Sequence, residues 1–299
     1  MSPRELSVIF SLNLVQDVQQ LFAFPFMVHA FQAGTIVAIL AAAIGWFMVL
    51  RRQSFAGHTL AVVGFPGAAG ATLIGLSASW GYFAFCIGAA LVLAGLTRST
   101  TKGLGEDSAV TGTVQAFLLA TGFLFATLYK GFLDGIYSYL FGSFLGITSS
   151  QVTTLLIVAV VALAVLAMLG RPLFFASIDA DVAAARGVPV RLLGTAFLVL
   201  LGIGAAETSQ ITGTLLVFAL LVMPAATAQL ITKRPGYGVG LSIVLSLVVT
   251  WLGLGVAYYS PYPIGFFVTT FAFGFYLAAQ LARRLNDRQS IRQKPRVMR

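Results

Sequence analysis

Charged residues are scarce in this sequence, and their scarcity excludes an ordinary soluble protein. Asp, Glu, Lys and Arg together make up only 9% of the 299 residues, whereas about 25% is usual in a soluble domain. Hydrophobic residues make up 59% of the chain, and several apolar runs reach the roughly 20 residues that a helix needs to cross a bilayer. We therefore predict an all-α, polytopic bundle of membrane-spanning helices.

Cysteine and histidine are also rare, which limits the chemistry available to the chain. The single cysteine, Cys86, lies within an apolar run, so an internal disulfide and a cysteine-held metal cluster are excluded. The two histidines, His29 and His58, belong to no HExxH motif and to no Ser/His/Asp arrangement. Because no catalytic set can be assembled, we expect that the chain is not an enzyme.

A phosphate-binding loop of the form GxxxxGK[ST] is missing as well. The nearest glycine-rich string, Lys102-Gly103-Leu104-Gly105, lacks the trailing lysine. We expect that this chain binds no cofactor and that it does not hydrolyse ATP itself.

What the sequence does contain is a series of apolar runs separated by loops of unequal charge. We predict nine spans, at residues 28–50, 56–77, 80–97, 108–129, 151–170, 191–209, 211–232, 237–259 and 263–283. In this layout 16 of the 18 Lys and Arg residues fall on one side, and only Arg4 and Lys130 fall on the other. An excess of basic residues marks the cytoplasmic side. The net charge of +9 therefore indicates topology rather than nucleic-acid binding, with the N-terminus outside and the C-terminus in the cytoplasm.

Segments outside these runs divide the chain into three parts. Leu6–Phe24 has apolar residues at helical spacing, so we expect residues 1–25 to form an interfacial helix before a transmembrane domain at 26–285. Residues 286–299 are basic and without a cap, and we expect a disordered cytoplasmic tail. Gly131–Gly146 is short for a span, which favours a re-entrant or interfacial helix.

The longest polar interruption, Phe174–Val190, predicts a short capped helix on the cytoplasmic side. Acidic residues begin it, alanines follow, and Arg and Gly end it, which is the order that N-capping, helix propensity and C-capping favour. Such a compact helix between two spans suits docking to another protein, although a solvated surface turn is the alternative. The residues that we assign to docking are Asp179, Asp181, Ala183, Ala184, Arg186 and Gly187.

Prolines and ionisable groups inside spans indicate a transport pathway. Pro66-Gly67 in the second span and Pro224 in the seventh lie in clusters of small residues, which favour bent helices lining a pathway or else ordinary helix packing. His58 and Glu207 are ionisable groups within or near spans, where such groups are costly and tend to be functional. For Glu207, in the string Glu-Thr-Ser-Gln, the alternative is an outer loop between two spans.

Taken together, these strings resemble the membrane permease subunit of ABC-type zinc, manganese and iron importers. The strings that carry the resemblance are Leu50–Ala61 with Pro66-Gly67, Tyr139–Ser143, Asp181–Pro189, and Gly213–Val217 with Leu221–Ala228. The resemblance implies a type II importer architecture in the cell membrane. It also implies a second permease copy or a paralogue, a dimer of ATPase subunits that uses the ATP, and an extracytoplasmic solute-binding protein. Asp179–Gly187 corresponds to the family's coupling helix.

One departure from the family bears on the substrate. The family's Asp and His, four residues apart on the second span and implicated in metal passage, align with His58 and Val62. His58 is thus the single candidate metal ligand that the resemblance leaves there. Divalent metal import is the leading interpretation. The alternatives are a permease of the same architecture for an iron chelate, haem or cobalamin, and an ATP-independent secondary transporter, which would normally show mid-span acids and an internal repeat.

Overall fold

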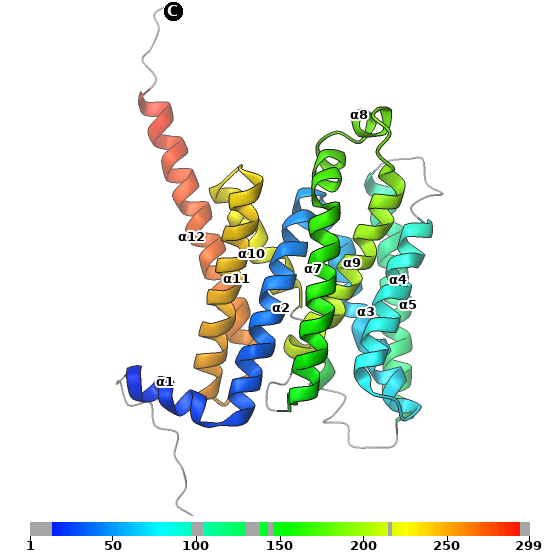
Figure 1. Ribbon diagram of the computed structural model, residues 1–299, viewed down its shortest axis with the longest axis vertical. Helices are drawn as coiled ribbons and strands as arrows, with labels where there is room; N and C mark the ends of the chain where they lie inside the picture. The colour runs from blue at the N-terminus through cyan, green and yellow to red at the C-terminus, as the bar shows by residue number, and fades with distance from the viewer. Residues whose placement is uncertain (1–13, 97–103, 130–137, 143–145, 215–216, 294–299) are drawn as a thin grey trace, which may run out of the picture.

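A computed structural model describes residues 14–96, 104–129, 138–142, 146–214 and 217–293. The described chain is helical throughout, as predicted, and its long helices run roughly along one axis (Figure 1). The helices are α1 (Leu14–Ala23), α2 (Pro25–Leu50), α3 (Ser54–Leu73), α4 (Ala78–Leu96), α5 (Leu104–Leu128), α7 (Ser149–Ile178), α8 (Ala180–Ala185), α9 (Val190–Thr212), α10 (Val217–Ile231), α11 (Pro235–Tyr258) and α12 (Ile264–Gln293).

Seven helices of the described chain are long and apolar enough to cross a membrane. They are α2, α4, α5, α7, α9, α11 and α12. The two other expected spans correspond to α3, which is less apolar, and to α10, which has only 15 residues. Both of these helices are largely buried against their neighbours. The structure therefore supports a polytopic bundle with seven clear candidate spans.

Helix α2 lies at the centre of the bundle and contacts α7, α9, α10 and α11. Between Val37 and Met48 its side chains are apolar on all sides and nearly all are buried, which is the pattern of a core helix. Gly45 allows the closest of these contacts, because a Cβ there would overlap the backbone carbonyl of Leu221 on α10. Small residues permit such approach in a bilayer, where lipid competes with apolar side chains.

A second group of helices, α3, α4 and α5, packs on one side of α9. Gly67 of α3 and Gly81 of α4 face each other so closely that a Cβ on either would overlap the backbone of the other. On the α5 side, a Cβ at Gly122 would lie 2.7 Å from Phe65 and 3.0 Å from the Cα of Pro66. The cluster of small residues in α3 thus serves close helix packing with α4 and α5.

Helix ends follow sequence signals. Pro25 and Pro235 occupy the first turns of α2 and α11, where a missing N–H costs no hydrogen bond. Thr148 caps α7 through a reciprocal pair: its Oγ1 accepts from the Gln151 amide at 3.2 Å, and Gln151 Oε1 accepts from the Thr148 amide at 3.0 Å. This capping box holds the first turn of α7, a helix that continues to Ile178, beyond the expected end at residue 170.

Two further helix ends differ from the sequence-based expectation. Helix α9 continues to Thr212, so the Glu207–Gln210 string lies inside the helix and the expected outer loop at residue 210 is wrong. Gly213, which follows α9, has φ +73° and packs on the backbone of residues 140–142, and the next described helix is α10. Helix α12 continues to Gln293, and this differs from the disorder expected from residue 286. Most of segment 131–146 lies outside the described residues.

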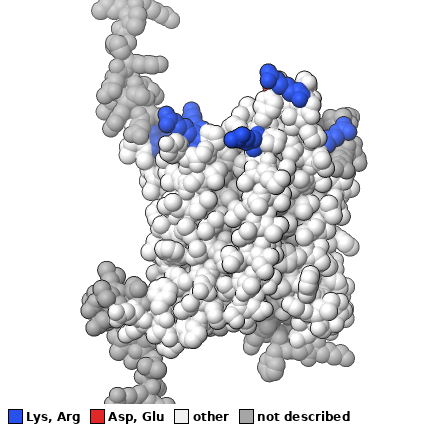
Figure 2. Space-filling view, in the orientation of Figure 1, with Lys and Arg blue, Asp and Glu red and all other residues white. Residues whose placement is uncertain are grey.

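Basic side chains gather at one end of the bundle, on the face seen in Figure 2. That is the end where Figure 1 shows α8 and the C-terminal part of α12, whereas α1 lies at the opposite end. This segregation agrees with the loop charges of the sequence. The interfacial role of residues 1–25 stays a prediction, since only α1 of that segment is described.

Exchanging Gly81 for Ala tests the close contact of α3 and α4. The added Cβ overlaps the backbone of Gly67, and we expect a loss of about 1–3 kcal/mol in the free energy of unfolding, as for other overpacked sites. Gly88→Ala on the same helix is the matched control, since a Cβ there meets nothing within 4 Å. Thermal unfolding of the purified proteins in detergent measures the difference. Equal melting temperatures for the two variants would contradict this packing.

The two ends of α11 provide a test of topology. A cysteine at Arg234, before the helix, is expected to be shielded from an impermeant thiol reagent in whole cells, and a cysteine at Tyr262, after it, is expected to react. The native Cys86 is buried and contributes little background. Permeabilised cells are the control in which both positions react. Labelling at Arg234 in intact cells would reverse the proposed orientation.

Candidate functional site

Helix α8 is the short capped helix that the sequence predicts between two spans. Asp179 is its N-cap: the Oδ1 atom accepts from the amides of Asp181 at 3.1 Å and Val182 at 2.9 Å. At the other end, Gly187 adopts φ +80°, and the amide of Val188 donates to the carbonyl of Ala183 at 3.0 Å. Together with the bond from the Gly187 amide to the carbonyl of Ala184, at 2.9 Å, this is a Schellman motif. The segment is therefore a capped helix, as the sequence predicts.

One face of α8 is anchored and the other is open. Ala183 is fully buried against the bundle, whereas Ala184, Ala185 and Arg186 are exposed. The helix lies at the end of the molecule, between α7 and α9 (Figure 1). It therefore presents a small, exposed face on a helix whose two ends are both capped.

His58 lies near the start of α3 and faces α10. Its ring is 5.3 Å from the ring of Phe218, in an edge-on arrangement at 84°, and the residue is half-buried. Val62, one turn further along α3, is buried. Within the described residues, no group of three or more His, Cys, Asp or Glu side chains comes together. His58 alone does not form a metal site, since such sites normally take several ligands.

Pro66 and Gly67 of the predicted pathway lie on α3 together with His58, and Pro224 lies on α10. Gly67 contacts α4, and Pro66 lies next to the position that a Cβ on Gly122 of α5 would take. Pro224 is buried within α10, the helix that contacts His58 through Phe218. Gly67 and Pro66 thus take part in helix packing, and their place in a transport pathway stays a prediction.

Glu207 is a buried acid in the interior of α9. It is 0% exposed, and neither carboxylate oxygen has a hydrogen-bond partner among the described residues. The neighbouring hydroxyls of Thr208 and Ser209 each donate at 2.7 Å to backbone carbonyls of their own helix, so they are not directed to the carboxylate. A buried charge without a partner is strongly unfavourable. Glu207 is therefore a group that a cation within the bundle would stabilise.

Arg51 is a residue with several contacts to which the sequence reasoning assigned no role. It follows α2, and its side chain reaches Ser177 at the end of α7 and Phe197 on α9. Partial burial lowers the pKa of Arg51 from its usual value, although a guanidinium stays charged in proteins. The signal available in the sequence was a basic pair, Arg51-Arg52, directly after a span.

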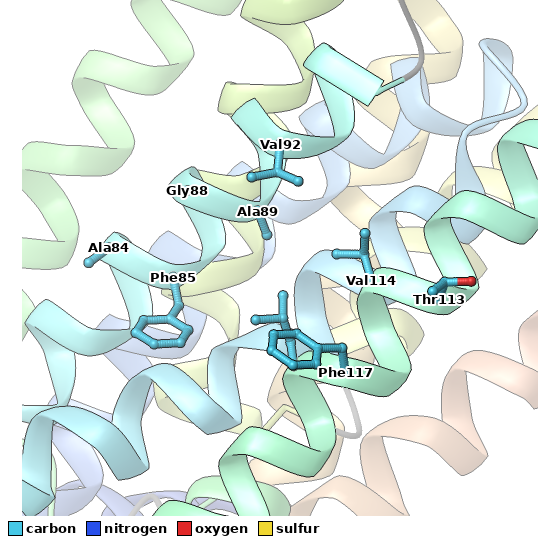
Figure 3. A pocket seen from close by; sticks show the side chains of 9 residues that line it. Ala84, Phe85, Gly88, Ala89, Val92, Thr113, Val114 and Phe117 are labelled. Atoms are coloured by element: carbon cyan, nitrogen blue, oxygen red, sulfur yellow. The ribbon is translucent and has the colours of Figure 1, made fainter. Parts of the chain in front are cut away.

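A groove of about 550 Å³ lies between α4 and α5 (Figure 3). Phe85 and Val92 of α4 and Phe117 of α5 line it, and Thr113 is its one polar lining residue. It contains no group that could hold a metal ion. The groove is apolar and open at its side, as is usual for a surface in contact with lipid.

Comparisons with known proteins agree with the helical arrangement. The chain is 28% identical over 241 residues to the manganese transport system membrane protein MntC of Listeria monocytogenes, covering 81% of this chain and 85% of the relative. It is 28% identical over 246 residues to the chelated iron transport system membrane protein YfeC of Yersinia pestis, covering 82% of each. The structure of PsaBC from Streptococcus pneumoniae in complex with Fab matches with a TM-score of 0.79 and 25% identity, over 89% of this chain and 95% of that one.

The family model covers nearly all of the transmembrane region. The model of the ABC 3 transport family matches residues 23–283, from the end of α1 into the last apolar helix. This range includes α8, His58 and Glu207. The chain belongs to the ABC 3 transport family.

Proposed function

We propose that this chain is the membrane-spanning permease subunit of an ATP-driven importer for a divalent metal ion. The observation that carries the proposal is membership of the ABC 3 transport family over residues 23–283. The names of the relatives support the substrate class, since they are transport proteins for manganese or chelated iron. In this proposal an extracytoplasmic binding protein delivers the substrate, and a separate ATPase supplies the energy.

The proposal extends to the assembly and its orientation. Nine of the described helices cross the membrane in this proposal: the seven long apolar helices, and also α3 and α10, which pack against their neighbours. The end that carries α8 and the basic side chains faces the cytoplasm. A second copy of this chain, or a close relative, completes the pathway beside it.

Helix α8 docks the ATPase in this proposal. Its ends are fixed by Asp179 and Gly187, and its exposed residues are mostly alanine, so a partner groove can close around it with little loss of side-chain entropy.

Ala184→Glu tests docking. A glutamate on the exposed face of α8 would be buried unpaired in the partner groove, at a cost of several kcal/mol, while the permease itself stays folded because Ala184 is exposed. We expect normal membrane levels and loss of the ATPase in a pull-down. Ala282→Glu is the matched control, an exposed alanine on α12 that lies away from α8. Retention of the ATPase by Ala184→Glu at the control level would exclude α8 as the docking element.

Gly187 provides an independent test of the same helix. Its φ of +80° is strained for a β-branched residue but acceptable for asparagine, and a Cβ there would meet no atom within 4 Å. We expect Gly187→Val to weaken retention of the ATPase and Gly187→Asn to preserve most of it. Equal retention by the two variants would indicate that the C-cap of α8 has no part in docking.

Glu207 and His58 are the groups that we expect the metal ion to meet. Glu207→Gln keeps the shape of the side chain and removes its charge, and we expect uptake of Mn²⁺ into cells to fall about tenfold, which corresponds to 1.4 kcal/mol. His58→Ala is expected to lower uptake in the same direction. His29→Ala is the control, since His29 lies near the start of α2 and His58 follows the end of that helix. Normal uptake by both Glu207→Gln and His58→Ala would remove these residues from the pathway.

An importer for a metal chelate is the second candidate function. It is favoured by one observation: the described residues hold no group of three metal-ligating side chains, and a chelate would arrive with its ligands already in place. The chain can be purified with its ATPase and binding protein, and the bound substrate can then be examined by metal and mass analysis. This experiment distinguishes the two candidate functions. A bare ion supports the first candidate, and an organic ligand supports the second.

A further inference from the structure

The side chain of Arg51 connects three helices at the cytoplasmic end of the bundle. Its Nη1 atom donates to Ser177 Oγ at 3.2 Å, and that hydroxyl donates to the carbonyl of Leu173 at 2.5 Å, in the last turns of α7. Its guanidinium carbon lies 5.5 Å from the centre of the Phe197 ring on α9. Since α8 lies between α7 and α9, Arg51 contacts the helices on both sides of α8.

The same side chain also contacts the start of α3. Its Nε atom donates at 3.3 Å to Oε1 of Gln53, the residue at the N-cap of α3. Helix α3 carries His58, whose ring contacts Phe218 on α10. A continuous series of contacts thus runs from the junction of α7 and α8, through Arg51, to the helix that carries His58.

Aromatic rings hold the base of Arg51 in place. Trp46 stacks on Phe174 of α7 with centroids 6.2 Å apart and planes at 23°, and Phe47 lies 6.5 Å from Phe197 of α9. These contacts fix the last turns of α2 against the helices that flank α8. Arg51 therefore cannot shift relative to α7 and α9 without disturbing packed rings.

We propose that Arg51 is a positioning residue that transmits movement of α8 to α3 during transport. The proposal rests on the proposed function and adds to it the connection between docking and the pathway. Arginine suits this role because its planar, permanently charged group can donate in several directions while its face lies on an aromatic ring. Loss of this connection leaves docking intact and separates ATP hydrolysis from transport.

The experiment compares lysine at two adjacent arginines. The permease is assembled with its ATPase and binding protein in liposomes, and Mn²⁺ uptake and ATP hydrolysis are measured on the same sample. We expect Arg51→Lys to retain the ATPase and to lower the uptake per ATP hydrolysed by at least about fivefold, the lower range of typical coupling effects. Arg52→Lys is the matched control: Arg52 is exposed, and the exchange should leave the ratio unchanged.

Ser177→Ala tests whether the effect of Arg51 passes through the hydrogen bond. We expect this substitution to lower the ratio of Mn²⁺ uptake to ATP hydrolysis, but by less than Arg51→Lys lowers it. In the double variant, the ratio should be no lower than in Arg51→Lys alone, because both substitutions interrupt one connection. An additive effect, or a ratio for Arg51→Lys equal to that of Arg52→Lys, would overturn the proposal. If Arg51→Lys does not accumulate in the membrane, the ratio in Ser177→Ala decides: a lowered ratio supports the proposal, and an unchanged one overturns it.

If the proposed function is wrong, the experiment gives a different result from the one expected if the role of Arg51 is wrong. A wild-type complex that hydrolyses ATP without taking up Mn²⁺ contradicts the substrate rather than the role of Arg51. In that case the stimulation of ATP hydrolysis by the binding protein is compared between Arg51→Lys and Arg52→Lys. Lower stimulation in Arg51→Lys supports the positioning role, and equal stimulation excludes it.

Discussion

Close backbone approach around α2 is the constraint on which the rest of this structure depends. Lipid tails solvate apolar side chains as well as other helices do, so membrane helices associate through packing, and packing is tightest where side chains are small. Gly45 brings α2 against the backbone of Leu221. That contact helps to explain how α10, with 15 residues, keeps a place in the bundle: α2, α11 and α12 enclose it.

The same principle holds the second group of helices together. Gly67 and Gly81 join α3 to α4, and α4 in turn packs on α9. The turn between α2 and α3 connects the central helix to this second group of helices. Arg51 lies in that turn, and its side chain reaches toward α7 and α9. Because the bundle interior has so few charged groups, Glu207 stands out as a buried acid without a partner among the described residues.

Prediction from sequence succeeded where the signal is local. Asp179 as an N-cap and Gly187 as the residue after the helix define α8, since capping depends on residues adjacent in the chain. At Glu207–Gln210 the sequence left two interpretations open, the end of a span and an outer loop between two spans. The structure keeps these residues helical because Thr208 and Ser209 bond to carbonyls of their own helix and because α9 is enclosed by neighbours. The role of Arg51 was missed because its partner Ser177 is 126 residues away in the chain.

The sequence by itself determined that this is an all-helical membrane protein, approximately where its long helices lie, and which loops carry the basic residues. These properties follow from hydropathy, charge and capping, all of which act over a few residues. Only the tertiary structure decided that Gly67 packs against α4, that His58 contacts α10, and that Glu207 is fully buried. The reason is physical: in a bilayer every face of a span is apolar, so hydropathy does not reveal which face meets lipid and which meets another helix.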